Sequence, residues 1–509
     1  MIGTSTDPDL STSQTTDSPS LMVERVFLLL ILVVAIAVRV RHQLLNVPFA
    51  VGIDEPAIVG RALRILQTGD WNTHTWDYPS LVSYIHALDV AARYLMGVVG
   101  GEWNSLTRMN MVAVFQAGRT VTAIIGVVTV WMTYRIGREF DSPRLGLAAA
   151  AMLAVLPMHV RESHFMLTDV PTTALVTLTV WLAIRAGQIR TVFAYALAGA
   201  AAGLSAAAKY NGGVAFVAIV IAWIVFDRSS SNRGRKAAAA VGGAAAAFLV
   251  GAPYTLLDLP NFLEGFGNSF GGLMMKVRRP TGDPIWLIYY KHLALSAWFW
   301  MPMAGLGVFV VLVRKAARAR WLIPIGFAAA YFYVLATHNL VYARYALPLT
   351  PMVCLLAAAP IAAIARAISV LAPSRNGRAG SAFMIGATLV FVIQFGITAT
   401  RWVETLQRPD TRTLVSKWLW ANSAAGSRVA VEANGPTYLE STGLAVPPTD
   451  RIIDRPLQSY VSEGFDYLVI SAERLDGYDP YLHAGPQVLH VSPSDSITGP
   501  DIRVIKLPR

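Results

Sequence analysis

Charged residues and cysteine are both scarce in this sequence. Charged side chains make up 14% of the 509 residues, apolar side chains make up 54%, and the mean hydropathy is +0.48. Soluble globular proteins carry about 25% charged residues, so this composition excludes an ordinary soluble enzyme. The single cysteine, Cys354, lies inside an apolar run, which excludes an intramolecular disulfide framework.

Acidic residues are outnumbered by basic ones, 31 to 42, and the formal net charge is +11. Such an excess can mark a nucleic-acid partner. Here most basic residues fall in short segments between long apolar runs, a distribution that orientation in a membrane explains better. We therefore expect contact with membrane lipids and no nucleic-acid partner.

Long apolar runs recur along most of the chain and predict a polytopic all-α membrane domain over residues 23–400. A further segment, 79–99, contains His86, Asp89 and Arg93, and this polar load suits an interfacial or re-entrant helix better than a span. Residues 1–22 are rich in Ser, Thr and Asp and are expected to form a disordered cytoplasmic tail. About eleven segments have the length and apolarity of transmembrane helices: 24–42, 110–134, 145–160, 168–186, 192–208, 213–226, 238–256, 292–313, 321–337, 344–370 and 381–400.

The basic residues of the short loops predict which loops face outward. Sixteen lie in the loops 135–144, 185–190, 227–236, 314–320 and 366–378. The alternating loops 160–168, 209–212 and 338–344 hold only Arg161, Lys209 and Arg344. Because cytoplasmic loops carry the excess of Lys and Arg, the second set is expected on the outer face of the plasma (inner) membrane. With eleven spans, the outer loop 43–109 and the C-terminus share that face.

Residues 401–509 change in character and predict a small α/β domain on the outer, periplasmic or extracellular, face. The apolar runs shorten to strand length in "RVAVEA", "DYLVIS", "QVLHV" and "IRVIKL", with Gly, Pro and Asp between them. A helical stretch is expected near 410–421. Nothing in this part of the sequence identifies a binding partner.

Two adjacent acids stand just beyond the first span, in "VPFAVGIDEPAIVGRALRILQTGDW" (residues 47–71). Pro56 suits a first helical turn, and the apolar residues that follow recur at helical spacing, so an amphipathic surface helix ending near Gly69 is predicted. An acid at this position can cap the helix. Capping accounts for one of Asp54 and Glu55, but not for both.

A second group of polar residues lies in the outer loop "HVRESHFMLTDV". Asp169 stands at the start of a span, where it could merely cap the helix. The histidines could be interfacial residues without a role, and as metal ligands they are weak candidates because their spacing matches no specific site. These histidines, with the nearby acids, are the reason to consider a divalent metal. The group comprises His159, Arg161, Glu162, His164 and Asp169.

Several cations are placed at or within the outer membrane boundary. Long outer loops tolerate positive charge, so solvation or contact with lipid headgroups also explains the cluster at 276–279. Cations at the boundary itself favour a paired role, and Arg and Lys there suit a lipid phosphate. The candidates are Arg119, Arg161, Lys209 with Tyr210, Lys291, and Arg344 with Tyr345.

Outward-facing acids beside a phosphate-binding cluster suggest group transfer from a polyprenyl-phosphate sugar. A carboxylate would take the proton of an acceptor hydroxyl, which attacks the sugar carbon while Arg and Lys stabilise the departing lipid phosphate. A second acid would orient the acceptor or the sugar. The polyprenyl tail explains a site at the membrane edge.

The order of these features resembles the polytopic GT-C glycosyltransferases, in particular the group with protein O-mannosyltransferases and bacterial aminoarabinose transferases. The stretches that carry the resemblance are "DEPAIVGRALRILQTGDW", "YPSLVSYIHAL", "AGRTVTAIIGVVTVWMTYRIGREF", "HVRESHFMLTDVPTT", "AAKYNG" and "YARYALPLTP". The resemblance implies Asp54 as catalytic base with Glu55 beside it, Asp169 as a second acid, and Lys209 and Arg344 at the donor phosphate. It also implies a polyprenyl-phosphate sugar donor, an acceptor lipid, glycan or protein, and a role in the cell envelope.

One motif departs from that pattern. Where the aminoarabinose transferases carry Lys-Pro-Pro and the mannosyltransferases His-Pro-Pro, this chain has Tyr78-Pro79-Ser80, which leaves the donor sugar and the acceptor open. Two other classes remain as alternatives. A transporter or flippase of a lipid-linked or anionic substrate would show two related halves and polar sites at the bilayer midplane, which the sequence does not suggest. A non-catalytic scaffold would have no reason to gather these acids on one face.

Overall fold

The computed structural model describes residues 19–508 except 53, 141–142, 276–281, 296, 315–317, 338–339, 372–377, 448, 450 and 473–474. The first helix, α1 (Pro19–Val40), begins four residues before the predicted membrane domain. The rest of the expected disordered tail, 1–18, lies outside the described residues. The basic cluster at 276–279 lies outside them as well.

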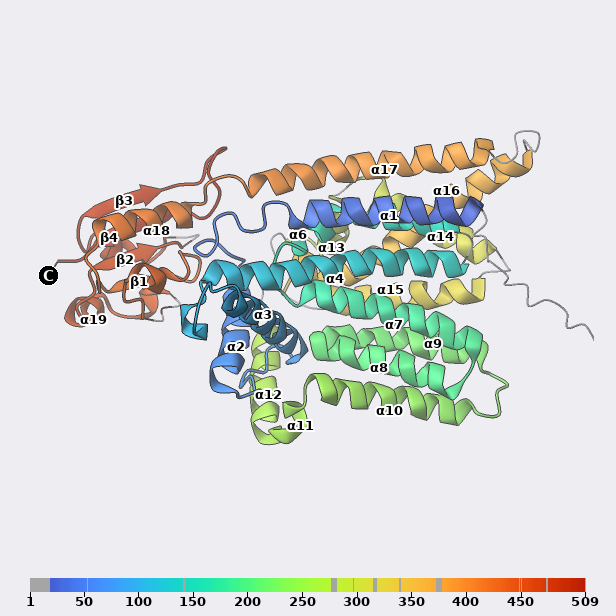
Figure 1. Cartoon of the computed structure of the whole chain (residues 1–509), viewed down its shortest axis with the longest axis horizontal. Helices are drawn as coiled ribbons and strands as arrows, with labels where there is room; N and C mark the ends of the chain where they lie inside the picture. The colour runs from blue at the N-terminus through green and yellow to red at the C-terminus, as the bar shows by residue number, and fades with distance from the viewer. Residues whose placement is uncertain are drawn as a thin grey trace, which may run out of the picture.

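Each of the eleven predicted spans corresponds to a helix, and Figure 1 shows these helices side by side along the long axis of the molecule. The polytopic helical fold predicted from hydropathy is confirmed. Their bounds are α1 (Pro19–Val40), α4 (Met111–Phe140), α5 (Pro143–Ala154), α7 (Asp169–Ile189), α8 (Val192–Ala208), α9 (Phe216–Phe226), α10 (Arg233–Gly251), α14 (Trp300–Val313), α15 (Arg318–Thr337), α16 (Thr350–Leu371, continuing from η3) and α17 (Arg378–Thr405).

By length and composition, six segments of the described chain can cross a bilayer: α1 from Leu21, α4, α7, α15, α16 together with η3, and α17. Four shorter segments are also apolar, namely α5, α8, the run 210–226 and α14. The remaining predicted span, α10, begins with Arg233, Arg235 and Lys236, so its first turn is strongly basic.

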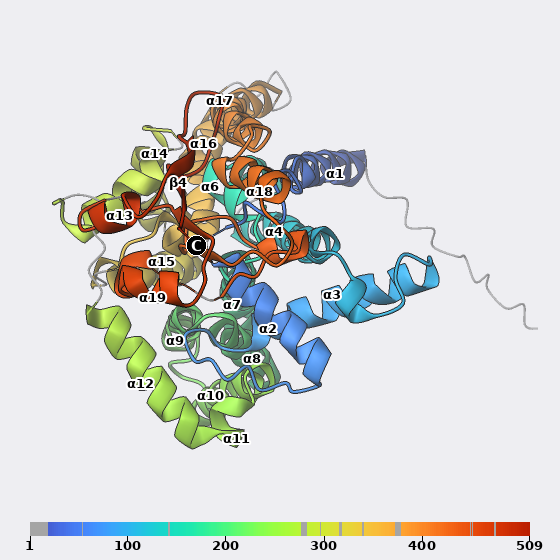
Figure 2. The same ribbon diagram turned by 90° about the vertical axis from the view of Figure 1, so that its left-hand side faces the viewer.

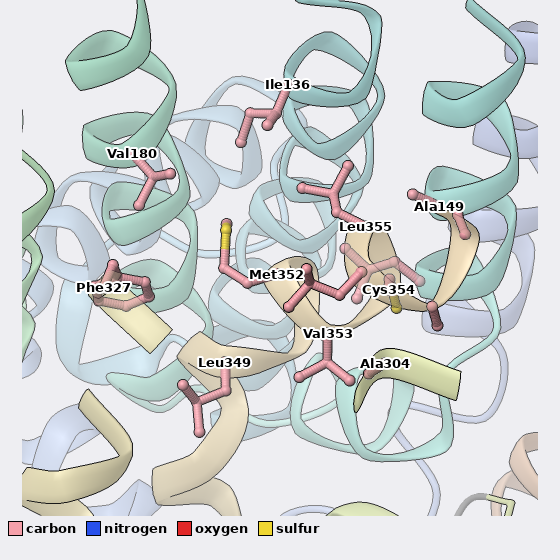
Figure 3. Close-up of a cluster of buried hydrophobic side chains, with 14 of the residues drawn as sticks. Ile136, Ala149, Val180, Ala304, Phe327, Leu349, Met352, Val353, Cys354 and Leu355 are labelled. Atoms are coloured by element: carbon pink, nitrogen blue, oxygen red, sulfur yellow. The ribbon is translucent and has the colours of Figure 1, made fainter. Parts of the chain in front are cut away.

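The centre of the bundle is α16, whose residues 350–362 are all buried. Figure 3 shows Met352, Cys354 and Leu355 of α16 among side chains from α4, α5, α7, α14 and α15. Small residues let neighbouring helices approach closely, as in many membrane bundles. A Cβ on Gly199 of α8, for example, would lie 2.0 Å from the carbonyl oxygen of Ala240 in α10. The packing of α8 on α10 therefore requires glycine at this position.

The C-terminal part forms the predicted small α/β domain at one end of the bundle (Figure 1). Its sheet has the order β1-β2-β4-β3, with β1 parallel to β2 and the other two pairs antiparallel. All four strands were predicted from their apolar runs. The elements are α18 (Thr411–Asn422), β1 (Val429–Val431), η5 (Leu439–Thr442), η6 (Ile452–Asp454), α19 (Leu457–Ser462), β2 (Tyr467–Ile470), α20 (Asp479–Leu482), β3 (Gln487–Val491) and β4 (Ile502–Lys506).

Further helical elements lie at the same end of the bundle as this domain. Figures 1 and 2 show α2, α3 and α12 lying across the long axis instead of running through the bundle. The segment around His86 is therefore a crosswise helix in the structure. The elements of this layer are α2 (Glu55–Thr68), α3 (Leu81–Val99), η1 (Leu106–Arg108), α6 (Pro157–Glu162), η2 (Tyr210–Ala215), α11 (Tyr254–Leu257), α12 (Leu259–Met275), α13 (Ile285–Ala294) and η3 (Ala343–Leu349).

The C-terminal domain is bonded to the loop that precedes α2. Thr437 donates hydrogen bonds from its backbone N–H to the carbonyl of Phe49 (3.1 Å) and from its hydroxyl to the carbonyl of Pro48 (2.6 Å). Arg412 donates to the carbonyl of Val51 (3.1 Å). The small domain thus holds the backbone of residues 48–51.

Candidate active site at the end of the bundle

The acidic pair stands at the start of α2. Asp54 is the residue before the first helical turn, Pro56 occupies that turn, and Gly69 ends the helix with φ +71°. The Asp54 side chain makes no capping hydrogen bond to the helix backbone. Capping therefore does not explain Asp54, and the two acids turn out to have different surroundings.

Glu55 is completely buried and both of its oxygens are bonded. Arg119 of α4 donates to Oε1 from Nε (3.0 Å) and to Oε2 from Nη2 (2.7 Å). The backbone N–H groups of Gly52 and Met166 also donate to this carboxylate, each at 2.7 Å. A buried charge requires this degree of pairing. Glu55 therefore ties together the loop before α2, helix α4 and the loop before α7.

Asp54 has different partners from Glu55 and belongs to a network of four charged side chains. Its carboxylate accepts a hydrogen bond from Nη2 of Arg344 in η3. Asp169, the first residue of α7, accepts a hydrogen bond from Nζ of Lys209 (2.7 Å), and its other oxygen lies 3.6 Å from Nε of Arg344. We call Asp54, Asp169, Lys209 and Arg344 the charged cluster. The side chain of Asp54 is 34% exposed, whereas that of Asp169 is 5% exposed.

Tyrosine rings surround the two cations of the charged cluster. Lys209 Nζ lies 4.3 Å from the ring centre of Tyr345 and 5.6 Å from that of Tyr78. The Arg344 guanidinium lies 4.9 Å from the ring centre of Tyr342. Cations over aromatic faces are stabilised and held in place. Burial raises the pKa of Tyr78, with contributions from Tyr345 and the two acids, so its phenol stays protonated and can donate a hydrogen bond.

The charged cluster is formally neutral, because its two carboxylates balance its two cations. An incoming phosphate would compete with the carboxylates for Arg344 and Lys209. Such competition weakens the Asp54–Arg344 contact and leaves the partly exposed Asp54 free to accept a proton. The arrangement therefore suits a reaction that needs both a phosphate-binding cation and a carboxylate base.

A second ion pair borders the charged cluster. Arg161 donates to Oε1 of Glu162 from Nε and Nη2, at 2.8 and 2.5 Å. Burial raises the pKa of the Glu162 carboxyl; Arg161 opposes this shift and the nearby Asp169 adds to it. Arg161 thus lies near the acids, but its guanidinium is already bonded to its neighbour in sequence, Glu162.

The two histidines of this loop are engaged by other groups. His159 Nδ1 lies 2.9 Å from Nη2 of the buried Arg39, and His164 contacts the carbonyl oxygens of Val160 and Arg41 at 2.8 and 3.1 Å. Among the residues that the structure describes, no three His, Cys, Asp or Glu side chains gather in a way that could bind a metal ion. The contacts of His159 and His164 are therefore those of residues that hold the fold together.

His164 provides a test of this environment. Burial lowers its pKa from 6.5 to about 4, against the effect of its carbonyl contacts. Between these values the unfolded chain binds a proton that the folded protein does not, so stability falls as the pH drops from 6.5 to 4. At about 1.4 kcal/mol per pH unit, the loss between pH 6.5 and pH 4 is about 3.5 kcal/mol at most. Thermal unfolding at pH 7 and pH 4.5 should show a smaller acid-induced loss for His164→Phe than for the wild type.

The control for this measurement is His483→Gln, which changes an exposed histidine of the C-terminal domain. This variant should lose as much stability between the two pH values as the wild type. Parallel losses in His164→Phe and the wild type would contradict the assignment of the acid sensitivity to His164.

Three other predicted residues are bonded to groups outside the charged cluster: Arg119, Tyr210 and Lys291. Arg119 is the partner of Glu55, and the Tyr210 hydroxyl donates to the carbonyl of Trp76 (3.2 Å). Lys291 pairs with Asp283 at 2.7 Å on an exposed part of α13. Tyr78 is the residue that the sequence-based candidates missed. Its position in the departing motif Tyr78-Pro79-Ser80 was the available signal.

Comparison with known proteins identifies the fold. Residues 106–256 match the family model described as dolichyl-phosphate-mannose-protein mannosyltransferase. ArnT from Cupriavidus metallidurans in the apo state superposes with a TM-score of 0.60 at 15% identity, over 96% of this chain and 98% of that one. The same protein bound to undecaprenyl phosphate gives a TM-score of 0.55 at 13% identity, over the same shares of the two chains.

A third similar structure is the oligosaccharyltransferase of Archaeoglobus fulgidus in its apo form. It superposes with a TM-score of 0.56 at 13% identity, over 88% of this chain and 69% of that one. No curated protein matches the chain by sequence. The GT-C fold expected from the sequence resemblance is therefore confirmed, from the first span through the small domain.

Proposed function

We propose that this chain, which has the GT-C glycosyltransferase fold, transfers a sugar from a polyprenyl-phosphate donor to an acceptor hydroxyl. The observation that carries the proposal is the charged cluster, which combines two acids and two cations at the end of the bundle. Undecaprenyl phosphate bound to the similar ArnT supports a lipid phosphate as the leaving group.

In the proposed reaction Asp54 is the general base. Its carboxylate takes the proton of the acceptor hydroxyl as the hydroxyl oxygen forms a bond to the anomeric carbon. The bond from that carbon to the phosphate oxygen breaks, and the electron pair leaves with the polyprenyl phosphate. Asp54 is the better placed of the two adjacent acids, because its side chain is partly exposed and, among the described residues, it forms an ion pair with Arg344 alone.

The cations act on the leaving group. Arg344 and Lys209 would bind the donor phosphate and stabilise the charge that it gains as the bond breaks. Asp169 holds Lys209 and borders Arg344, so it positions both cations and can orient the sugar. Glu55 is a positioning residue: its ion pair with Arg119 fixes the start of α2, next to Asp54.

The proposed sidedness follows from the distribution of basic residues. The charged cluster lies at the end of the bundle that carries the small domain, and the basic ends of α4, α10 and α15 lie at the opposite end (Figure 1). By the positive-inside rule, this distribution supports a position of the cluster on the periplasmic or extracellular face. A transporter would instead need a polar site near the midplane, where α16 is lined by apolar residues.

A transfer assay in proteoliposomes tests the function. The purified protein is given a panel of polyprenyl-phosphate hexoses and pentoses together with a cell-envelope extract as acceptor. Sugar-dependent release of polyprenyl phosphate is expected for one donor or a few. A protein that moves intact donor across the liposome membrane and releases no polyprenyl phosphate would support the transporter alternative and contradict the proposal.

The phosphate-binding role predicts a specific kinetic effect. Arg344→Gln removes one charge-assisted contact, worth about 1.5–3 kcal/mol, so the donor KM should rise by roughly 10- to 100-fold. The control is Arg93→Gln on α3, whose guanidinium pairs with the exposed Glu102. This control should keep the wild-type KM. An unchanged donor KM in Arg344→Gln would contradict phosphate binding by this residue.

A further inference from the structure

A cavity of about 720 Å³ lies where the membrane domain meets the small domain. Gly52 and Phe165 line it from the bundle side, Trp402 from the end of α17, and Asn434 and Ser471 from the small domain. Its volume is in the range of ligand sites, about 300–1,000 Å³. No member of the charged cluster lines the cavity, so it is a separate site.

The charged side chains in the described part of its wall are already paired. Arg412 donates two hydrogen bonds to Asp410, at 2.8 and 2.9 Å, and Arg119 is bonded to the buried Glu55. Asp501 accepts a hydrogen bond from the hydroxyl of Ser492 at 2.6 Å and contacts His490. A phosphate or a carboxylate would have to break one of these pairs in order to bind. The electrostatics of the wall therefore favour a neutral ligand.

Two polar side chains of the wall belong to the small domain, Asn434 and Ser471. Asn434 is half-buried. The hydroxyl of Ser471, a residue only 1% exposed, is buried without a hydrogen-bond partner among the described residues. An amide offers both donors and an acceptor, and a hydroxyl offers one of each. Such groups match the hydroxyls of a sugar, and Trp402 and Phe165 offer aromatic surface for the apolar side of a sugar ring.

The position of the cavity connects it with the proposed reaction. Gly52 lies two residues before Asp54, and its N–H group donates to Glu55. Arg119, which also lines the cavity, donates to both oxygens of the same carboxylate. A ligand in the cavity would thus rest against the short segment that carries the proposed base.

We propose that this cavity binds a neutral oligosaccharide, the carbohydrate portion of the acceptor. The identification of this oligosaccharide as part of the acceptor rests on the proposed function, but its binding to the cavity does not. The small domain, for which the sequence indicated no role, then supplies half of a carbohydrate site. Binding to this site requires neither the donor nor the charged cluster.

Direct binding tests the proposal in the donor-free protein. The protein in nanodiscs is titrated with neutral oligosaccharides of glucose, mannose, galactose and arabinose, and calorimetry measures Kd. At least one of them is expected to bind the wild type, and Asn434→Ala and Trp402→Ala should each raise its Kd by at least tenfold. The matched control is Trp420→Ala, which removes a tryptophan of α18 that is 68% exposed and does not line the cavity.

The outcomes separate this site from the proposed function. If the protein has no transfer activity but binds an oligosaccharide in a way that depends on Asn434, the carbohydrate site is supported and the proposed transferase function is contradicted. Two results would overturn the site. One is folded wild-type protein that binds none of these oligosaccharides. The other is binding that neither Asn434→Ala nor Trp402→Ala weakens.

Discussion

Replacing Asp54 with asparagine should reduce sugar transfer by roughly 10²- to 10⁴-fold, the usual contribution of a positioned general base. The asparagine has the same shape as the carboxylate but cannot accept the proton of the acceptor hydroxyl. The loss should appear in kcat, since Arg344 and Lys209 remain to bind the donor phosphate. The measurement is the rate of polyprenyl-phosphate release at saturating donor.

Folding should survive this change, because the Asp54 side chain is 34% exposed and makes no capping hydrogen bond to α2. Thermal unfolding of the variant should therefore resemble that of the wild type. Glu102→Gln serves as the control, since it removes an exposed carboxylate from the same outer segment. Turnover by Asp54→Asn at the wild-type rate would exclude Asp54 as the base.

Replacing Glu55 with glutamine should have the opposite profile, a large loss of stability. The change leaves Arg119 as a buried guanidinium without its anion and places an amide group against backbone N–H donors. Removal of one partner from a buried pair costs about 3–5 kcal/mol. Thermal or denaturant unfolding in detergent micelles, measured beside Asp54→Asn, should separate the neighbouring acids.

A matched exposed pair shows whether burial causes this effect. The Arg93–Glu102 pair has side chains 21% and 46% exposed, and exposed pairs are worth about 0–1 kcal/mol. Glu102→Gln should therefore change stability little. A double variant, Glu55→Gln with Arg119→Met, should recover part of the loss, because it removes the unpaired charge. Wild-type stability in Glu55→Gln would contradict a structural role for this carboxylate.

The sequence allowed the helices and strands to be predicted because both signals are local. A segment that crosses a bilayer must satisfy its own backbone groups, so a long apolar run is a reliable sign of a helix. The four short apolar runs after residue 401 were equally clear. The crosswise position of α3 could be anticipated from its polar residues, but its direction is set by packing at the end of the bundle.

The candidate site was predicted in part. Loop parity alone placed Asp54, Asp169, Lys209 and Arg344 on one face, and the structure joins them in one network. The partner of a side chain cannot be predicted in the same way, because it depends on which neighbour folding brings within about 3 Å. Arg119 was therefore grouped with the phosphate-binding cations, whereas it is the partner of Glu55.

The hydrogen bonds from Thr437 and Arg412 to residues 48–51 have a consequence for protein engineering. Through these bonds the small domain holds residues 48–51, which precede Asp54 in the sequence. A chain that ends after α17 would therefore lose contacts that help to position the proposed base. Chimeras that exchange the small domain between related enzymes should therefore exchange residues 46–52 with it. The natural unit of recombination in this protein is discontinuous in sequence.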